Sequence, residues 1–133
     1  MKTTEKGRLS ITTDRNNKQV VVFQPINNTI WMNRNELCEL FGVYMQATNV
    51  AIDAIFKAKI FRVEDVCKCQ RYVKGNRINY DITEVNLDVV VAMAFHLDSP
   101  NATLLRKWFM EQLMRPKRID FSLLNTTQNY SLN

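Results

Sequence analysis

Short apolar runs separated by turn residues occupy the first part of the chain. The run "KQVVVFQ", residues 18–24, has the β-branched composition of a strand, and "TIWM", residues 29–32, is a second candidate. Because the intervening "PINN" has the composition of a turn, the two runs predict a short β-hairpin in which Ile26 or Trp31 faces inward. Residues 1–17 are polar and predict a flexible N-terminal segment, or at most a weak edge strand.

Two amphipathic segments follow, one on each side of a glycine. Asn33 is a natural N-cap, and Glu36 three residues later completes a capping-box pattern. The apolar stripe of this first helix ends at Gly42, a residue type that commonly ends helices in the left-handed conformation. The second helix is predicted over residues 45–58 after a short step, as in a helix-turn-helix.

The second helix has two distinct faces at about 100° per residue. The arc expected to face inward is apolar and consists of Ala47, Val50, Ala51, Ala54, Ile55 and Ala58. The arc expected to face outward is polar and consists of Gln46, Asn49, Asp53 and Lys57. Ile52 and Phe56 lie at the margin between the arcs, where contact with another element is expected.

A second hairpin is predicted in "RVEDVCKCQRYVKGNRINYDIT", residues 62–83, with "KGN" as its turn. Two helices followed by a basic hairpin have the layout of a winged helix-turn-helix. Downstream, "NLDVVVAMAFHL", residues 86–97, predicts a buried helix. Ser99 as N-cap and Pro100 at the first helical position mark the start of the last helix.

Together these elements predict an α+β fold that is winged helix-turn-helix-like. It has a short N-terminal β-hairpin, a basic hairpin wing and two packed C-terminal helices. Residues 18–115 are expected to form a single domain, which suits a chain of 133 residues. Residues 116–133 follow a helix-stopping proline and predict a C-terminal tail.

The net charge of +5 is concentrated in one short stretch. Residues 57–77 carry seven basic side chains against two acidic ones, which gives net +5, whereas residues 1–56 give net +1 and residues 78–133 give net −1. A concentrated positive field suits a polyanion, although a solvated basic surface is the alternative. The position of the stretch, on a wing and at a helix end, favours the polyanion.

Double-stranded DNA is therefore the expected partner, with weak sequence specificity. Gln46 and Asn49 could pair with adenine in the major groove, but the charge lies on the hairpin and at the helix end. About three or four phosphate contacts would give salt-sensitive binding. The predicted DNA-binding residues are Gln46, Asn49, Lys57, Lys59, Arg62, Lys68, Arg71, Lys74 and Arg77.

Other kinds of chemistry find little support in the sequence. Cys67 and Cys69, with Cys38 and His96 distant in sequence, lack the spacing of a zinc site. With one histidine, three glycines and no nucleophile or phosphate-loop motif, we expect no catalytic residue, cofactor, bound metal or small-molecule substrate. An odd cysteine count indicates a reducing cytoplasm, and neither a secretory signal nor a membrane-spanning run is apparent.

Three motifs resemble one family of bacterial proteins. "TIWMNRNELCELFGV", "DAIFKAKIF" and "VNLDVVVAMAFHLDSPNATLLRKW" are similar to the RhuM-type virulence-associated family, and the similarity spans roughly residues 18–115. The last helix pair resembles, more weakly, the amino-terminal DNA-binding domains of Bro-type phage antirepressors. The matching residues are Trp31, Glu39, Leu40, Phe41, Gly42, Val43, Ile55, Phe56, Lys57, Asn86, Leu87, Asp88, Ser99, Arg106 and Trp108.

This resemblance implies a cytoplasmic, DNA-binding-like domain of phage or mobile-element ancestry, with a role in regulation and no established enzymatic activity. The segment "YMQATNVAI", residues 44–52, departs from the polar and basic sequence that the family has there. The longer members of the family also continue past the last helix.

The alternative hypothesis is a protein-interaction module with the same fold. In that case Met45, Ile52 and Phe56 would form a contiguous exposed surface for dimerisation or for another partner. A two-fold homodimer would fit either hypothesis, because DNA-binding proteins commonly pair across two half-sites.

Overall fold

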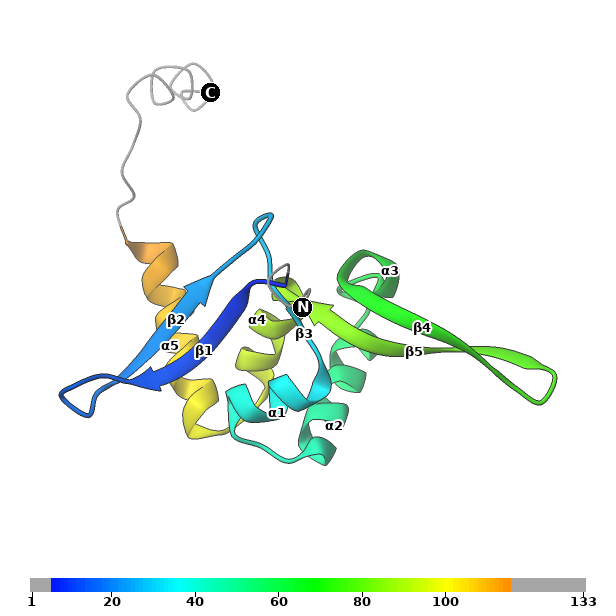
Figure 1. The fold of residues 1–133 in the computed structure, drawn as a ribbon, viewed down its shortest axis with the longest axis horizontal. Helices are drawn as coiled ribbons and strands as arrows, with labels where there is room; N and C mark the ends of the chain where they lie inside the picture. The colour runs from blue at the N-terminus through cyan, green and yellow to red at the C-terminus, as the bar shows by residue number, and fades with distance from the viewer. Residues whose placement is uncertain (1–5, 116–133) are drawn as a thin grey trace, which may run out of the picture.

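The computed structural model describes residues 6–115 of the chain. The elements follow in the order β1 (Arg8–Thr13), β2 (Gln19–Gln24), β3 (Trp31–Met32), α1 (Arg34–Phe41), α2 (Met45–Lys57), α3 (Val63–Val66), β4 (Cys67–Lys74), β5 (Arg77–Asn86), α4 (Leu87–His96) and α5 (Pro100–Met114). Figure 1 shows the helices near the centre of the molecule, with the β1–β2 and β4–β5 hairpins extending toward opposite ends. The mixed α+β class is as predicted.

The N-terminal hairpin forms from different strands than predicted. β2 pairs antiparallel with β1, from Arg8–Gln24 to Thr13–Gln19, and not with residues 29–32. Ile26 and Thr29 make only an isolated bridge. Of the two predictions for residues 1–17, the edge strand is the one that the structure bears out for Arg8–Thr13; residues 1–5 lie outside the described part of the chain.

A buried face explains why β1 is a strand. Leu9 pairs with Phe23 and Ile11 with Val21, so one face of the hairpin carries four apolar side chains. Leu9 is only 4% exposed, and the other three pack against the core. The loop between the strands closes where the Asp14 carboxylate accepts hydrogen bonds from two backbone N–H groups.

The two predicted N-terminal helices are confirmed as α1 and α2, and α5 holds the end of α1. Asn33 and Glu36 form the predicted capping box, and Gly42 has a φ of 65°. The Ser99 hydroxyl donates to the Phe41 carbonyl at 2.7 Å, and the Asn101 amide donates to the Leu40 carbonyl at 2.9 Å. Carbonyls that α1 leaves without partners at its end are thus satisfied from α5.

β3, β5 and β4 form an antiparallel sheet in that order. The predicted second hairpin is confirmed as β4–β5, and β3 pairs with the end of β5 at Trp31–Asn86 and Met32–Val85. The short helix α3, which leads into β4, was not predicted. Because β3 directly precedes α1, this sheet links the helices to the hairpin.

Helices α4 and α5 form the centre of the core. Val89, Val90 and Met93 of α4 are fully buried, as is Leu105 of α5. Asn86 caps α4, and Ser99 with Pro100 begins α5, as predicted. The predicted C-terminal tail, residues 116–133, lies outside the described residues. No helix between residues 6 and 115 is both long and apolar enough to cross a membrane.

Candidate nucleic-acid interface

The orientation of α2 differs from the predicted one by roughly one position. Its buried residues are Thr48, Ala51, Ile52 and Ile55. Val50, predicted to face inward, is 57% exposed, whereas Ile52 is 1% exposed. Burying Ile52 removes more apolar surface from water than burying Val50, and the buried Thr48 hydroxyl finds a partner in the Cys38 thiol at 3.3 Å.

The outward arc of α2 is mixed in character. Gln46, Asp53 and Lys57 are exposed as predicted. Asn49 is half-buried, and its side-chain oxygen accepts a hydrogen bond from the Arg34 guanidinium. A bidentate pair with adenine requires both the oxygen and the nitrogen of the amide. Asn49 could therefore read a base only after it separates from Arg34.

The alternative apolar surface at Met45, Ile52 and Phe56 is not present as predicted. Ile52 belongs to the core, and Phe56 is half-buried against it. Of the three, only Met45 is exposed, and the exposed apolar side chains next to it are Tyr44, which is 90% exposed, and Val50. The surface that would have favoured a protein-interaction module through these three residues is therefore absent.

The β4–β5 hairpin projects from the molecule (Figure 1). Every residue of β4 after Cys67 is exposed. Lys74 and Arg77 lie directly opposite each other, joined by Gly75 and Asn76. Gly75 has a φ of 64°, and the favoured two-residue hairpin turns need such a positive φ. The turn thus places two cations side by side at the tip.

The predicted cations fall into three groups with different surroundings. Lys57 and Lys59 lie at the end of α2, and Arg62 and Lys68 lie before and at the base of the hairpin. The third group, on the outer hairpin, consists of Arg71, Lys74 and Arg77. Since cross-strand partners share a face and faces alternate along a strand, Arg71 with Tyr80 lies on the opposite face from Lys74 with Arg77.

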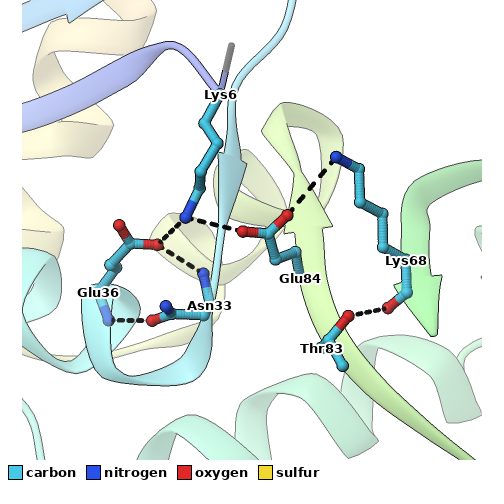
Figure 2. A network of polar contacts seen from close by, with 6 residues as sticks. All are labelled: Lys6, Asn33, Glu36, Lys68, Thr83 and Glu84. Carbon is cyan, nitrogen blue, oxygen red and sulfur yellow. Dashed lines mark hydrogen bonds and ion pairs between the residues drawn. The ribbon is translucent and has the colours of Figure 1, made fainter. Parts of the chain in front are cut away.

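Both cations of the middle group are engaged with acidic neighbours. Arg62 pairs with Glu64 at 2.7 Å, and the hydrogen bond and charge of Glu64 raise the pKa of Arg62. Lys68 lies 3.6 Å from Glu84 (Figure 2). Its ammonium is also 4.5 Å from the centre of the Trp31 ring. Within residues 6–115, Lys57, Lys59 and the three outer-hairpin cations form no ion pair.

A polar network anchors the base of the hairpin to the N-terminus of α1. Lys6 lies 2.7 Å from both Glu36 and Glu84, and Glu36 is the capping-box residue of α1 (Figure 2). Glu84 is on β5 and also contacts Lys68. The Thr83 hydroxyl donates to the Lys68 carbonyl at 3.0 Å, beside the irregularity in the β4–β5 register. The predictions did not include this network, because its members are far apart in sequence.

Within residues 6–115, the cysteines and acidic residues do not gather into a metal centre. Among the described residues, no group of three or more His, Cys, Asp or Glu side chains could hold a metal ion. Cys67 and Cys69 share a face of β4, but only Cys69 is exposed. Burial raises the pKa of the Cys67 thiol to about 11, so it remains protonated at neutral pH. An apolar hollow of about 610 Å³, which Phe23, Trp108 and Leu113 help to line, includes none of the predicted site residues.

Comparisons with known proteins add no relative to this description: no protein-family model matches the chain, and searches of curated proteins and of solved structures found no match. The resemblance to the RhuM-type family thus depends on the sequence motifs alone.

Proposed function

We propose that this chain is a winged helix-turn-helix-like domain that binds double-stranded DNA and has no enzymatic activity. The β4–β5 hairpin is the wing, and the end of α2 supplies additional cations. Three features support the proposal: the α1–α2 unit joined at Gly42, the order β3-β5-β4 in the sheet, and the basic outer hairpin. The RhuM-like motifs suggest a mobile-element regulator as its setting.

The observation that carries the proposal is the tip of the hairpin. Lys74 and Arg77 lie opposite each other on a projecting ribbon, and neither forms an ion pair within the described residues. A ribbon of this kind can approach the phosphate backbone without the desolvation of neighbouring acidic groups. Arg71, Lys57 and Lys59 add cations that are likewise outside any ion pair in residues 6–115.

Phosphate contacts would dominate the affinity. Each neutralised phosphate contributes about −0.9 to the slope of log K against log salt concentration. If the five cations outside ion pairs all reached phosphates, the slope would approach roughly −4.5, and three contacts would give roughly −2.7. Arg62 and Lys68 would contribute less than predicted, because Glu64 and Glu84 already neutralise them.

Base recognition by α2 would be weak. Asp53 on the outward arc repels phosphate, and Asn49 is engaged by Arg34. Gln46 remains able to pair with adenine, and the exposed Val50 could contact a thymine methyl group. We therefore expect modest preference among sequences and a specificity ratio well below that of a typical repressor.

Fluorescence anisotropy with a labelled duplex, at low and raised salt, tests the proposal. The informative variant is Lys74→Ala/Arg77→Ala at the tip of the projecting hairpin. Its matched control is Arg15→Ala/Lys18→Ala, which removes the same charge from the exposed β1–β2 loop at the other end of the molecule (Figure 1). Far-ultraviolet circular dichroism verifies that both variants fold.

The expected result is salt-dependent binding by the wild type, with a slope reduced by about 2 in the tip variant and unchanged in the control. Absence of binding at low salt would refute the proposal. Equal losses in both double variants would show that only net charge matters, and the hairpin would then have no special role.

A further inference from the structure

An apolar pair lies beside the cationic tip of the wing. Val73 and Ile78 face each other across the β4–β5 hairpin, one position further from the turn than Lys74 and Arg77. They are 67% and 54% exposed. Because side chains alternate along a strand, this pair lies on the opposite face of the ribbon from the two cations.

This face of the hairpin packs against the core at its base and is exposed toward the tip. The pairs Cys69–Ile82, Arg71–Tyr80 and Val73–Ile78 follow one another on this face. Ile82 packs against the core, whereas Tyr80 is exposed. Nothing between residues 6 and 115 covers the pair nearest the turn. The tip therefore has one cationic face and one apolar face, and Arg71 is the cation on the same face as the apolar pair.

The width of the ribbon limits how it could enter the minor groove of DNA, whereas the wider major groove admits a two-stranded ribbon. The minor groove of B-DNA is about 6 Å wide, and neighbouring strands are about 4.8 Å apart before side chains are added. A two-stranded tip fits there only if the groove opens. Proteins that open the minor groove insert apolar side chains between base steps and bend the duplex by about 20–90°.

We infer, on the basis of the proposed DNA-binding function, that the hairpin enters the minor groove tip first and bends the duplex. Val73 and Ile78 form the wedge that separates adjacent base pairs, and Lys74 and Arg77 contact the flanking phosphates. Charge complementarity favours DNA over a second copy of this chain, since two such tips would bring four cations together. The wing is then an architectural element as well as a source of charge.

The test uses the full chain and a duplex of about 30 base pairs, which is stiff because it is far shorter than the persistence length of about 150 base pairs. Donor and acceptor dyes on its two ends report bending as a rise in energy transfer. The wedge variant is Val73→Thr/Ile78→Thr, which keeps β-branched residues and all charges. The control, Val20→Thr/Ile26→Thr, makes the same chemical changes at partly exposed positions in β2 and in the turn that follows it. Anisotropy measures binding of the same duplex in parallel.

The expected result is a rise in energy transfer with the wild type and the control, and loss of this rise in the wedge variant at saturating protein. Salt-dependent binding persists in all three. If the wild type binds without a change in energy transfer, the wedge is refuted while the proposed function stands. If it does not bind at low salt, both are refuted.

Two further outcomes would overturn the assignment of the apolar pair. A wedge variant that bends DNA as strongly as the wild type would show that Val73 and Ile78 do not enter the stack. Sedimentation that reveals wild-type self-association, lost in the wedge variant and kept in the control, would instead assign the apolar face to a contact between copies of the chain.

Discussion

The β1–β2 hairpin lies against α5, whereas the outer half of the β4–β5 hairpin has no neighbouring element among residues 6–115. On the docked hairpin, the Phe23 ring meets Trp108 edge-on, with 5.7 Å between ring centres. On the projecting hairpin, the equivalent apolar side chains, Val73 and Ile78, are exposed. Each hairpin has one strand that alternates polar and apolar residues, β1 and β5, so alternation alone does not determine whether a hairpin packs against the core.

The tips of the two hairpins carry the same number of cations but differ in how far they project from the molecule. Arg15 and Lys18 lie in the loop of the docked hairpin, and Lys74 and Arg77 flank the turn of the projecting one. Each pair contributes two positive charges. The difference is that the second pair is carried away from the body on a long ribbon (Figure 1). The proposed wing is therefore defined by projection together with charge.

The largest expected effect is a loss of stability when a buried residue of the docked hairpin is truncated, compared with an exposed residue of the projecting one. Leu9→Ala should lower the free energy of unfolding by about 2–5 kcal/mol, because it removes a buried side chain and leaves a cavity. Ile78→Ala removes an exposed strand residue and should cost less than about 1 kcal/mol. Urea unfolding followed by circular dichroism measures both. Equal costs would mean that β1 does not pack on the core.

Glycine-to-alanine substitutions at two positions also compare the packed N-terminal segment with the projecting tip. Gly7 and Gly75 both have positive φ values, of 71° and 64°. A Cβ at Gly7 would come within 3.0 Å of the Gln24 carbonyl oxygen and of Ile30, whereas a Cβ at Gly75 would meet nothing within 4 Å. Gly75→Ala should cost about 1–2 kcal/mol of backbone strain, and Gly7→Ala about 2–4 kcal/mol, because overpacking is added. Thermal unfolding that ranks the two in the reverse order would contradict the docked position of the N-terminal segment.

Local signals in the sequence were sufficient to locate the four longer helices, α1, α2, α4 and α5. Asn33 with Glu36, Gly42, and Ser99 with Pro100 all end or begin helices as predicted, because capping depends on residues three or four positions apart. The strand partner of β2 depends on distant packing instead. In β1, Leu9 and Ile11 alternate with serine, threonine and arginine, so the segment appears polar until its buried face is known.

The candidate site was only partly predictable for a related reason. The tip cations Lys74 and Arg77 follow from the turn, which is local. The pairing of Lys68 with Glu84 depends on strand register and on an irregularity beside Lys68, so net charge gave no sign of it. The face of α2 was misplaced because its alanines distinguish inside from outside poorly, and Ile52 decided the orientation.

Substitution of Lys6, at the base of the projecting hairpin, is expected to cause an intermediate loss of stability. Lys6→Met should lower the free energy of unfolding by about 1–3 kcal/mol, because Glu36 and Glu84 lose a charged donor in a half-buried setting. Lys18→Met, on the exposed loop of the docked hairpin, should change it by no more than about 0.5 kcal/mol. A loss in Lys6→Met no larger than in this control would show that the network does not stabilise the domain.

The pH dependence of this contribution has a definite sign. Burial disfavours the charged form of Lys6, but hydrogen bonds and charges from Glu36 and Glu84 outweigh it, so the pKa of Lys6 is raised above 10.5. The folded state therefore holds this proton more tightly than the unfolded state. The stability difference between wild type and Lys6→Met should be complete below pH 10.5 and shrink above it. Cys67 is present in both proteins, so its titration cancels in the difference.

The smallest expected effects come from two hydroxyl groups, one on each hairpin. The Ser10 hydroxyl on β1 is buried and has no hydrogen-bond partner among residues 6–115, so Ser10→Ala should be neutral or stabilising by up to about 1 kcal/mol. The Thr83 hydroxyl on β5 donates to the Lys68 carbonyl at 3.0 Å, so Thr83→Ala should cost about 0.5–1.5 kcal/mol. Urea unfolding of both variants and of the wild type measures these changes in the free energy of unfolding, which are expected to have opposite signs. A clear loss of stability in Ser10→Ala would mean that its hydroxyl has a partner in solution, and the docked hairpin would then be held by polar contact as well as by apolar burial.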